Sequence, residues 1–174
     1  VTNDDKMAEF LRLYRNHGLL DRDHVEIWGV NDRLQPFQAV VGSRVLDTIE
    51  TLVEARIRNA RLLDEGLKGL ESCVRPPHRP SGYREVYQLY LVTATRRDEL
   101  VKFLVSHGIE AKVHYPIPIH LQNAAQGLGY KRGDFPVCER QADEIVTLPA
   151  HQHITDKQID YTVSAIREFY GAHN

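Results

Sequence analysis

The chain has 174 residues, of which 42% are apolar and 26% charged, a composition typical of a soluble globular protein with one ordinary core. Its formal net charge of −2 gives no long-range attraction to nucleic acid. No apolar stretch approaches the roughly 20 residues of a membrane span, and no signal-peptide pattern opens the chain, so we expect a cytoplasmic protein. Cys73 and Cys138 are isolated, which argues against a disulfide framework or a cysteine-based metal site.

The first predicted helix begins almost at once. Thr2 or Asn3 is placed to cap it and Gly18 to end it. Its apolar positions follow the i, i+3, i+4, i+7 pattern and predict a buried stripe of Met7, Phe10, Leu11 and Tyr14. There is no initiator Met, and the first two residues read like the end of a strand. We therefore expect a chain cut from something longer.

A strand-like segment, residues 24–30, follows and is expected to be tethered by Trp28. Residues 37–70 then read as a long helical region, with breaks at Gly42 and at residues 46–48. Asp47 and Glu50 have capping-box spacing for the second helix. The apolar stripe of that helix is Ile49, Val53, Ile57, Ala60, Leu63 and Leu67. Its three central arginines, Arg56, Arg58 and Arg61, are most simply a solvated face.

The second half of the chain alternates between strand and helix patterns. Residues 75–82 are a proline-rich connection, and residues 86–94 form the strongest strand pattern. A helix opened by Thr95 with Asp98 and closed by Gly108 leads into a second strand at residues 109–115. A short helix at residues 136–146 and a final helix opened by Thr155 with Gln158 complete the chain. The buried stripe of the final helix is Ile159, Val163, Ile166 and Phe169. This order favours a small α+β layer with helices on one face of a short sheet.

Catalytic side chains are few. Of the six lysines, only Lys112 stands near other functional-looking groups, because strand alternation places it on the same face as His114. A lysine on the protein surface is still the simpler reading. The histidine pairs 114/120 and 151/153 lack an Asp, Glu or Cys at a matching spacing, which argues against a metal site.

Two segments carry the remaining signals. In "GVNDRLQPFQA", residues 29–39, Asn31 and Arg33 lie in a turn ahead of a helix, where polar side chains and backbone donors can meet an anion. Asn31 can equally well only cap the turn. In "HYPIPIH", residues 114–120, the prolines stiffen an extended backbone and hold polar side chains at the end of a sheet. A simple surface connection is the alternative.

Five motifs in order resemble the C-terminal half of the DegT/DnrJ/EryC1/StrS family of pyridoxal phosphate (PLP)-dependent nucleotide-sugar aminotransferases. They are "RNHGL", "GVNDRLQPFQA", "HYPIPIHLQ", "KRGDFPVCERQA" and "TLPAHQHITDKQIDY". The resemblance covers essentially the whole chain. It is closest to the branch that aminates 3-keto-6-deoxy sugars carried on dTDP.

The resemblance implies an α+β fragment of an α/β fold. Residues 1–46 would be the end of a large PLP domain with its cofactor-phosphate turn. Residues 47–174 would be the linking helix and the small C-terminal domain of the aspartate-aminotransferase fold. The implied reaction transfers an amino group from glutamate to a keto-sugar nucleotide in deoxyaminosugar biosynthesis, for a lipopolysaccharide or an antibiotic. The intact enzyme would be a homodimer that binds neither nucleic acid nor membrane.

The same resemblance implies the roles of individual residues. Asn31 matches an asparagine that reaches the PLP phosphate of the neighbouring subunit, and Arg33 matches the arginine beside it. His114 and Tyr115 match a His-Tyr pair that contacts the hexose, and His120 matches a second histidine near the sugar or the diphosphate. No residue of the chain matches a catalytic position.

The family's Schiff-base lysine would lie upstream of Val1, so we expect the chain alone to be inactive. Two alternatives remain. One is a free-standing small-molecule-binding or regulatory module. The other is an interaction piece that docks through its first helix.

Overall fold

The computed structural model describes residues 2–171 and divides into two compact units. The first unit ends at Ile49 and the second begins at Glu50. This division lies close to the boundary expected between residues 46 and 47, although the assignment of the two parts to domains of a larger protein stays a prediction. No helix within residues 2–171 is both long and apolar enough to cross a membrane.

Helix α1, Asp5–Tyr14, is capped by Asp4, whose side chain accepts a hydrogen bond from the backbone N–H of Met7 at 3.0 Å. Thr2 stands further out and accepts a hydrogen bond from the backbone N–H of Asp4. The cap expected at Thr2 or Asn3 is therefore wrong. An aspartate carboxylate satisfies the free N–H groups equally well, and its charge suits the positive end of the helix.

The segment after α1 folds back on itself through an antiparallel bridge between Asn16 and Asn31. Gly18 lies at the closest approach, with φ of +72°, and an added Cβ would lie 1.6 Å from the carbonyl oxygen of Ile27. Glycine is required at this turn, which comes four residues after the last residue of α1. Trp28 is 93% exposed, so the expectation that it tethers this segment is wrong.

The apolar stripe of α1 is exposed rather than buried. Its four members, Met7, Phe10, Leu11 and Tyr14, are between 40% and 49% exposed. Phe10 and Tyr14 stack on each other with ring centroids 5.7 Å apart, and no described element covers them. The burial predicted for this stripe is thus wrong for this chain. An amphipathic pattern shows that a helix has an apolar face, but not which element covers it.

Two helices, α2 (Pro36–Leu46) and α3 (Ile49–Gly66), replace the long predicted helical region. Helix α2 passes through Gly42 without a break, because a helix tolerates an isolated glycine at a modest cost. The break predicted at residues 46–48 is confirmed. Asp47, however, forms an ion pair with Arg44 at 3.2 Å and is the C-cap of α2, so the capping box expected there is not formed.

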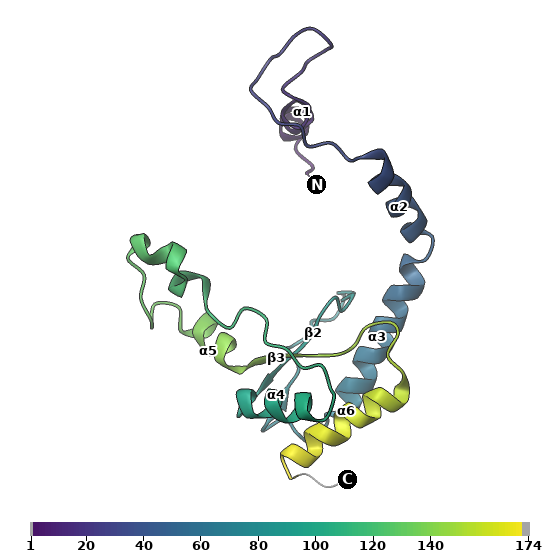
Figure 1. Ribbon diagram of the computed structural model, residues 1–174, viewed down its shortest axis with the longest axis vertical. Coiled ribbons are helices and arrows are strands. Elements are labelled where there is room, and N and C mark those ends of the chain that lie inside the picture. The colour runs from purple at the N-terminus through teal and green to yellow at the C-terminus, as the bar shows by residue number, and fades with distance from the viewer. Residues whose placement is uncertain (1, 172–174) are drawn as a thin grey trace. The chain divides into compact units, whose positions relative to one another are not determined.

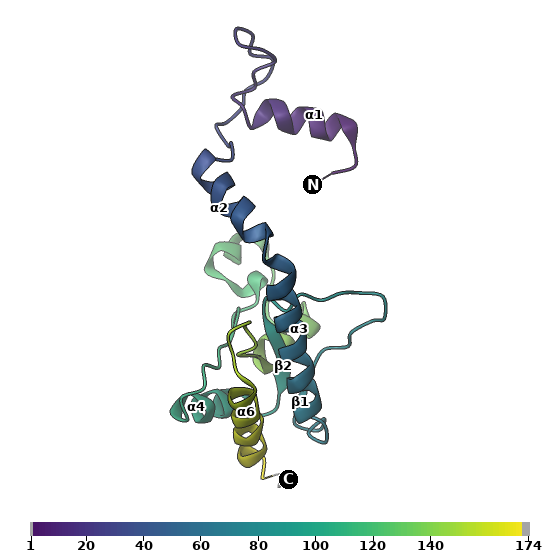
Figure 2. The same cartoon turned by 90° about the vertical axis from the view of Figure 1, so that its right-hand side faces the viewer.

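The second unit contains a three-stranded antiparallel sheet in the order β1-β2-β3. Figure 1 labels β2 and β3, and Figure 2 labels β1 and β2. The strands are β1 (Val74–Arg75), β2 (Tyr90–Ala94) and β3 (Ile145–Leu148). The sequence predicts β2 but neither β1 nor β3. The strand predicted at residues 109–115 is wrong, because only one antiparallel bridge, Lys112 to Thr147, is formed there. The prolines that follow lack the N–H donors needed to extend the pairing.

One face of the sheet carries the core. Alternate residues of β2 are buried and pair with buried residues of the flanking strands, in the register Tyr90↔Leu148, Val92↔Val146 and Ala94↔Val74. They form one apolar cluster with residues of α3, α4 (Arg97–Ser106) and α6 (Asp156–Phe169) (Figures 1 and 2). The prediction of helices on one face of a short sheet agrees with this arrangement.

The helix starts in this unit show which local rules hold. The capping box of α6 is confirmed, since Gln158 Oε1 accepts from the backbone N–H of Thr155 at 2.9 Å. The predicted stripe of α6 also packs on the core. Helix α4 begins after Arg96, whose φ is +51°, so the cap expected at Thr95 is wrong.

Between α4 and β3 the chain forms three short helices. They are the 3-10 helices η1 (Ile119–Leu121) and η2 (Asn123–Leu128), followed by α5 (Pro136–Glu144). Helix α5 lies against β2. It ends at Glu144, before the end predicted at residue 146, because the next four residues pair as β3.

The predicted solvated face of α3 holds only in part. Arg56 is half-buried, and its Nε donates to Gln152 Oε1 at 2.9 Å while its Nη1 donates to the carbonyl of Tyr87 at 3.2 Å. This arginine joins α3 to two connecting segments, so it is a structural residue. Arg58 and Arg61 are exposed as predicted.

Candidate active site

The predicted site residues fall in both units, so the two groups are described separately. Asn31 and Arg33 lie in the first unit, whereas His114, Tyr115 and His120 lie in the second.

Asn31 sits in a turn that is fixed by its backbone. Besides the bridge to Asn16, the neighbouring Gly29 approaches α1 so closely that an added Cβ would lie 2.5 Å from the carbonyl oxygen of Tyr14. Arg33 Nε donates to Asn31 Oδ1 at 3.2 Å, and both side chains are exposed. The bond uses the oxygen of the amide, so the Asn31 NH₂ group and the outer guanidinium nitrogens of Arg33 remain as donors.

Within residues 2–171 Arg33 forms no ion pair with a carboxylate, and such a group of donors suits an anion such as a phosphate. The backbone donors at the start of α2 contribute less than expected, because Gln38 Oε1 already accepts from the backbone N–H of Gln35 at 3.1 Å. The anion-binding potential of this turn therefore lies in the Asn31 and Arg33 side chains.

His114 stands on the face of the sheet opposite to the core. Its position follows from the bridge two residues earlier, where Lys112 and Thr147 exchange two backbone hydrogen bonds of 3.2 and 2.8 Å. His114 Nδ1 then lies 2.7 Å from the hydroxyl oxygen of Thr147. Lys112 lines a cavity with His114, as strand alternation predicts, and is exposed and paired with Glu110.

Tyr115 is held in an unusual backbone conformation. Its φ is +57°, in the left-handed region that non-glycine residues rarely occupy, and its side chain is 84% exposed. The proline that follows it disfavours the right-handed helical conformation for residue 115. Strain of this kind is often kept at binding sites. The chain turns sharply here, immediately after His114.

His120 is buried, unlike the other two residues of this loop. Its Nε2 lies 3.0 Å from Glu139 Oε1, and its ring lies 4.8 Å from that of Phe135. Glu139 also accepts from the backbone N–H of Gly133 at 2.7 Å. The geometry therefore makes His120 an anchor that ties the loop to α5. Its direct contact with a substrate stays a prediction.

Several effects act on the pKa of Glu139. Burial acts to raise the pKa of this carboxyl, but hydrogen bonds from the backbone of Gly133, from His120 and from Phe135 outweigh it and hold the pKa below its ordinary value. The carboxyl is thus kept ionised near neutral pH. An ionised carboxylate here accepts several donors at once, which fixes the turn after η2.

Two cavities meet at His114. One, of about 500 Å³, is also lined by Tyr115, Ile117, Gln122 and Gln141. The other, of about 190 Å³, lies between α3 and β3 and includes Arg56, Lys112 and His151. The larger cavity has the mixed apolar and polar lining that suits a sugar-sized ligand.

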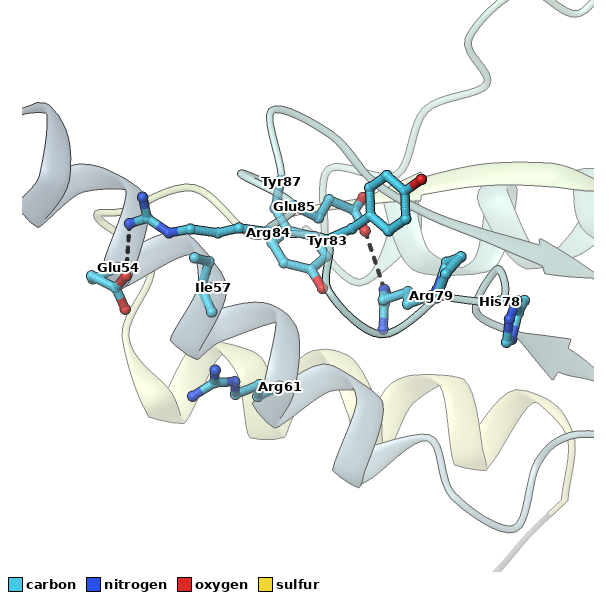
Figure 3. A pocket seen from close by; sticks show the side chains of 10 residues that line it. Glu54, Ile57, Arg61, His78, Arg79, Tyr83, Arg84, Glu85 and Tyr87 are labelled. Atoms are coloured by element: carbon cyan, nitrogen blue, oxygen red, sulfur yellow. Dashed lines mark hydrogen bonds and ion pairs between the residues drawn. The ribbon is translucent and has the colours of Figure 1, made fainter.

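A further cavity of the second unit, about 660 Å³, lies elsewhere and contains none of the predicted site residues (Figure 3). It is formed by α3 and the connection from residue 78 to residue 87. Arg79 pairs with Asp64 and Glu85, while Arg84 pairs with carboxylates of α3. These pairings leave little net charge for a ligand. Sequence reasoning treated this proline-rich segment only as a connection.

Within residues 2–171 no group of three or more His, Cys, Asp or Glu side chains is arranged to hold a metal ion. All six lysines, at positions 6, 68, 102, 112, 131 and 157, are exposed. A lysine that acts as a nucleophile needs a desolvated or cationic environment that lowers its pKa, and exposure works against this.

The sequence and the fold of this chain are similar to those of known proteins. Residues 1–167 match the DegT/DnrJ/EryC1/StrS aminotransferase family. The chain is 37% identical over 174 residues to a "Pleiotropic regulatory protein" of Geobacillus stearothermophilus, with 98% of this chain and 46% of that protein covered. It is 34% identical to a dTDP-3-amino-3,4,6-trideoxy-alpha-D-glucose transaminase of Streptomyces venezuelae, with 97% of this chain and 44% of that protein covered.

A solved structure of S. venezuelae DesV is 32% identical and superposes with a TM-score of 0.92, over 100% of this chain and 47% of DesV. The predicted fold class, a fragment of a PLP-transferase fold, is thereby confirmed. The chain spans about half the length of the curated relatives it matches.

Proposed function

This chain belongs to the DegT/DnrJ/EryC1/StrS aminotransferase family, and from that premise we propose that it forms the C-terminal part of a sugar-nucleotide aminotransferase. The complete enzyme moves an amino group from glutamate to a keto-6-deoxysugar nucleotide in deoxyaminosugar biosynthesis and works in the cytoplasm. The observation that carries this proposal is the family match over residues 1–167, with sugar-nucleotide transaminases among the relatives.

The family uses PLP, and the turn at Asn31 fits its phosphate. When bound, PLP would supply the carrier of the amino group and the electron sink of the reaction. The Asn31 NH₂ group and the Arg33 guanidinium offer donors and no negative charge, which is the chemistry that a phosphate dianion requires. We place this phosphate in the neighbouring subunit of a homodimer, as the family resemblance implies.

The keto sugar is assigned to the loop at residues 114–120. His114 Nε2 and the Tyr115 hydroxyl are polar groups that hydrogen-bond with sugar hydroxyls, and both residues border the cavity of about 500 Å³. The two prolines of the loop limit its freedom, so the polar groups are in place before the ligand arrives. His120 supports the loop from its buried pair with Glu139.

The chain alone is expected not to attach PLP through a lysine. All six of its lysines are exposed, and Lys112 is paired with Glu110. The test is borohydride reduction after PLP addition, followed by mass mapping. Near-stoichiometric labelling of Lys112 contradicts this expectation, whereas trace labelling spread over several lysines agrees with it.

A regulatory module is the second candidate, and the name "Pleiotropic regulatory protein" of the relative from Geobacillus stearothermophilus favours it. One experiment separates the two. The complete protein that contains this chain is assayed with glutamate, PLP and a panel of keto-sugar nucleotides. Turnover of one of them supports the aminotransferase. If the protein binds a nucleotide sugar but transfers no amino group to any of the panel, the regulatory reading replaces it.

A further inference from the structure

Thr147 is a buried residue whose hydroxyl contacts His114. It lies in the middle of β3 and is 9% exposed. Both its backbone N–H and its carbonyl are engaged with Lys112 across the bridge. Within the described residues, the hydrogen bond recorded for its side chain is the one to His114 Nδ1, at 2.7 Å.

His114 depends on this contact for its orientation. The chain leaves the edge of the sheet directly after it, since Tyr115 adopts φ of +57° and a proline follows. The ring of Tyr115 is tilted by 57° with its centroid 6.4 Å away, which is too loose to fix an imidazole. The hydroxyl of Thr147 is therefore the group that sets the rotation of the His114 ring.

We propose that Thr147 is the positioning residue of the sugar site, and that it holds His114 Nδ1 so that Nε2 is presented to the keto sugar. The inference rests on the proposed function and adds a residue that the family resemblance did not supply. It follows from the two nitrogens of imidazole, because the partner of one decides how the other is used. With Nδ1 engaged by Thr147, Nε2 is the ring nitrogen left for a ligand.

A hydroxyl is suited to this position in a way that a carboxylate is not. It can donate to an unprotonated Nδ1 or accept from a protonated one, so the contact survives a change in the protonation state of His114. A carboxylate only accepts, and it would favour the imidazolium. Thr147 thus fixes the direction of the ring without fixing its charge.

The spectroscopic test uses this chain with ¹⁵N-labelled histidine. Thr147→Val keeps the side-chain shape and removes the hydroxyl, while Thr147→Ser restores a hydroxyl. The control is Thr162→Val, because Thr162 is also buried but its hydroxyl donates to the carbonyl of Gln158 within α6. We expect the His114 ring nitrogen signals to shift in Thr147→Val alone. Unchanged signals in that variant overturn the proposal.

The kinetic test uses the complete enzyme and a double-mutant cycle. A neutral hydrogen bond is worth a factor of about two to ten, so Thr147→Val should lower kcat/KM for the keto sugar by that factor and leave the glutamate half-reaction unchanged. In a His114→Ala background Thr147→Val should have no further effect. Equal losses in both backgrounds refute positioning. If no keto-sugar nucleotide reacts at all, the proposed function fails, and the ring spectrum still decides the contact.

Discussion

Arg97 offers the sharpest test of how the second unit is held together. Its side chain is only 9% exposed, and its Nη1 donates to the carbonyl of Ala142 at 3.0 Å and to that of Ile145 at 2.9 Å. One guanidinium therefore joins the start of α4 to the end of α5 and the first residue of β3. Arg97 thus fixes the start of β3, the strand that contains Thr147.

The substitution Arg97→Met keeps most of the apolar stem and removes the donors. Each of the two carbonyls then loses a bond to a charged group, and an unsatisfied buried acceptor costs roughly 1–3 kcal/mol. The carbonyl oxygens keep a second lone pair for other donors, so we expect the free energy of unfolding to fall by about 2–4 kcal/mol. For a chain of this size, that lowers Tm by about 5–15 °C.

Urea unfolding followed by circular dichroism measures this loss, with Arg96→Met as the matched control. Arg96 is the preceding residue, but its side chain is 56% exposed and its ion pair with Glu99 lies on the surface. Exposed pairs contribute about 1 kcal/mol or less. If the two variants lose equal stability, or Arg97→Met loses less than about 1 kcal/mol, the role given to Arg97 is wrong.

Three further predictions concern the site. In the complete enzyme, His114→Ala should lower kcat/KM for the keto sugar by roughly ten- to a hundredfold and leave the glutamate half-reaction within a few-fold of normal, because a sugar hydroxyl left without a partner costs about 1–3 kcal/mol. Stopped-flow traces of both half-reactions decide this, with His78→Ala as control, and an equal loss in both half-reactions would remove His114 from the sugar site. Asn31→Ala should weaken PLP binding by about ten- to a hundredfold, with Asn123→Ala unaffected. Mixed dimers with a variant of the Schiff-base lysine test whether Asn31 contacts the cofactor of its own subunit or that of the neighbouring subunit. Cofactor loss in the subunit that carries Asn31→Ala itself would disprove a cross-subunit contact. The pKa of Glu139 is lowered on folding, so the stability it gives is present above its ordinary pKa near 4.5 and is lost as the pH falls below that value. Glu139→Gln should therefore flatten the acid limb of the stability curve, and an unchanged limb would argue against this.

The sequence predicts a helix cap, a helix break and a strand that depend on residues close together in the chain. Thr155 and Gln158 stand three residues apart and form the capping box that their spacing indicates. The break between α2 and α3 lies within the three residues predicted for it. The β2 strand, rich in aromatic and β-branched residues, occupies the second half of the range 86–94 that its composition predicts.

Features that depend on distant partners were not predictable in this way. β3 is four residues long and follows α5 directly, so its pattern is too short to separate from the end of a helix. Its existence depends on pairing with β2, more than 50 residues earlier in the chain. The sequence predicts a solvated Arg56, because the partners of this side chain, Gln152 and the carbonyl of Tyr87, lie far away in sequence.

The candidate site shows the same limit at the level of single residues. His114, Tyr115 and His120 are predicted as site residues from the motif alone, and the motif does not show that their environments differ. Tyr115 is exposed, whereas His120 is buried against Glu139, a residue that carries no signal of its own in the sequence.

The contacts of the 114–120 loop give its two histidines different tasks. At one end, the hydroxyl of Thr147 holds His114 at the edge of the sheet and leaves Nε2 without a protein partner among the described residues. At the other end, the Nε2 of His120 is already paired with Glu139 in a buried site inside the protein. We therefore infer that His114 contacts the sugar and that His120 supports the loop. The two prolines between His114 and His120 restrict the backbone of the loop. Because His120 is fixed, a stiff segment also limits the positions that His114 can occupy.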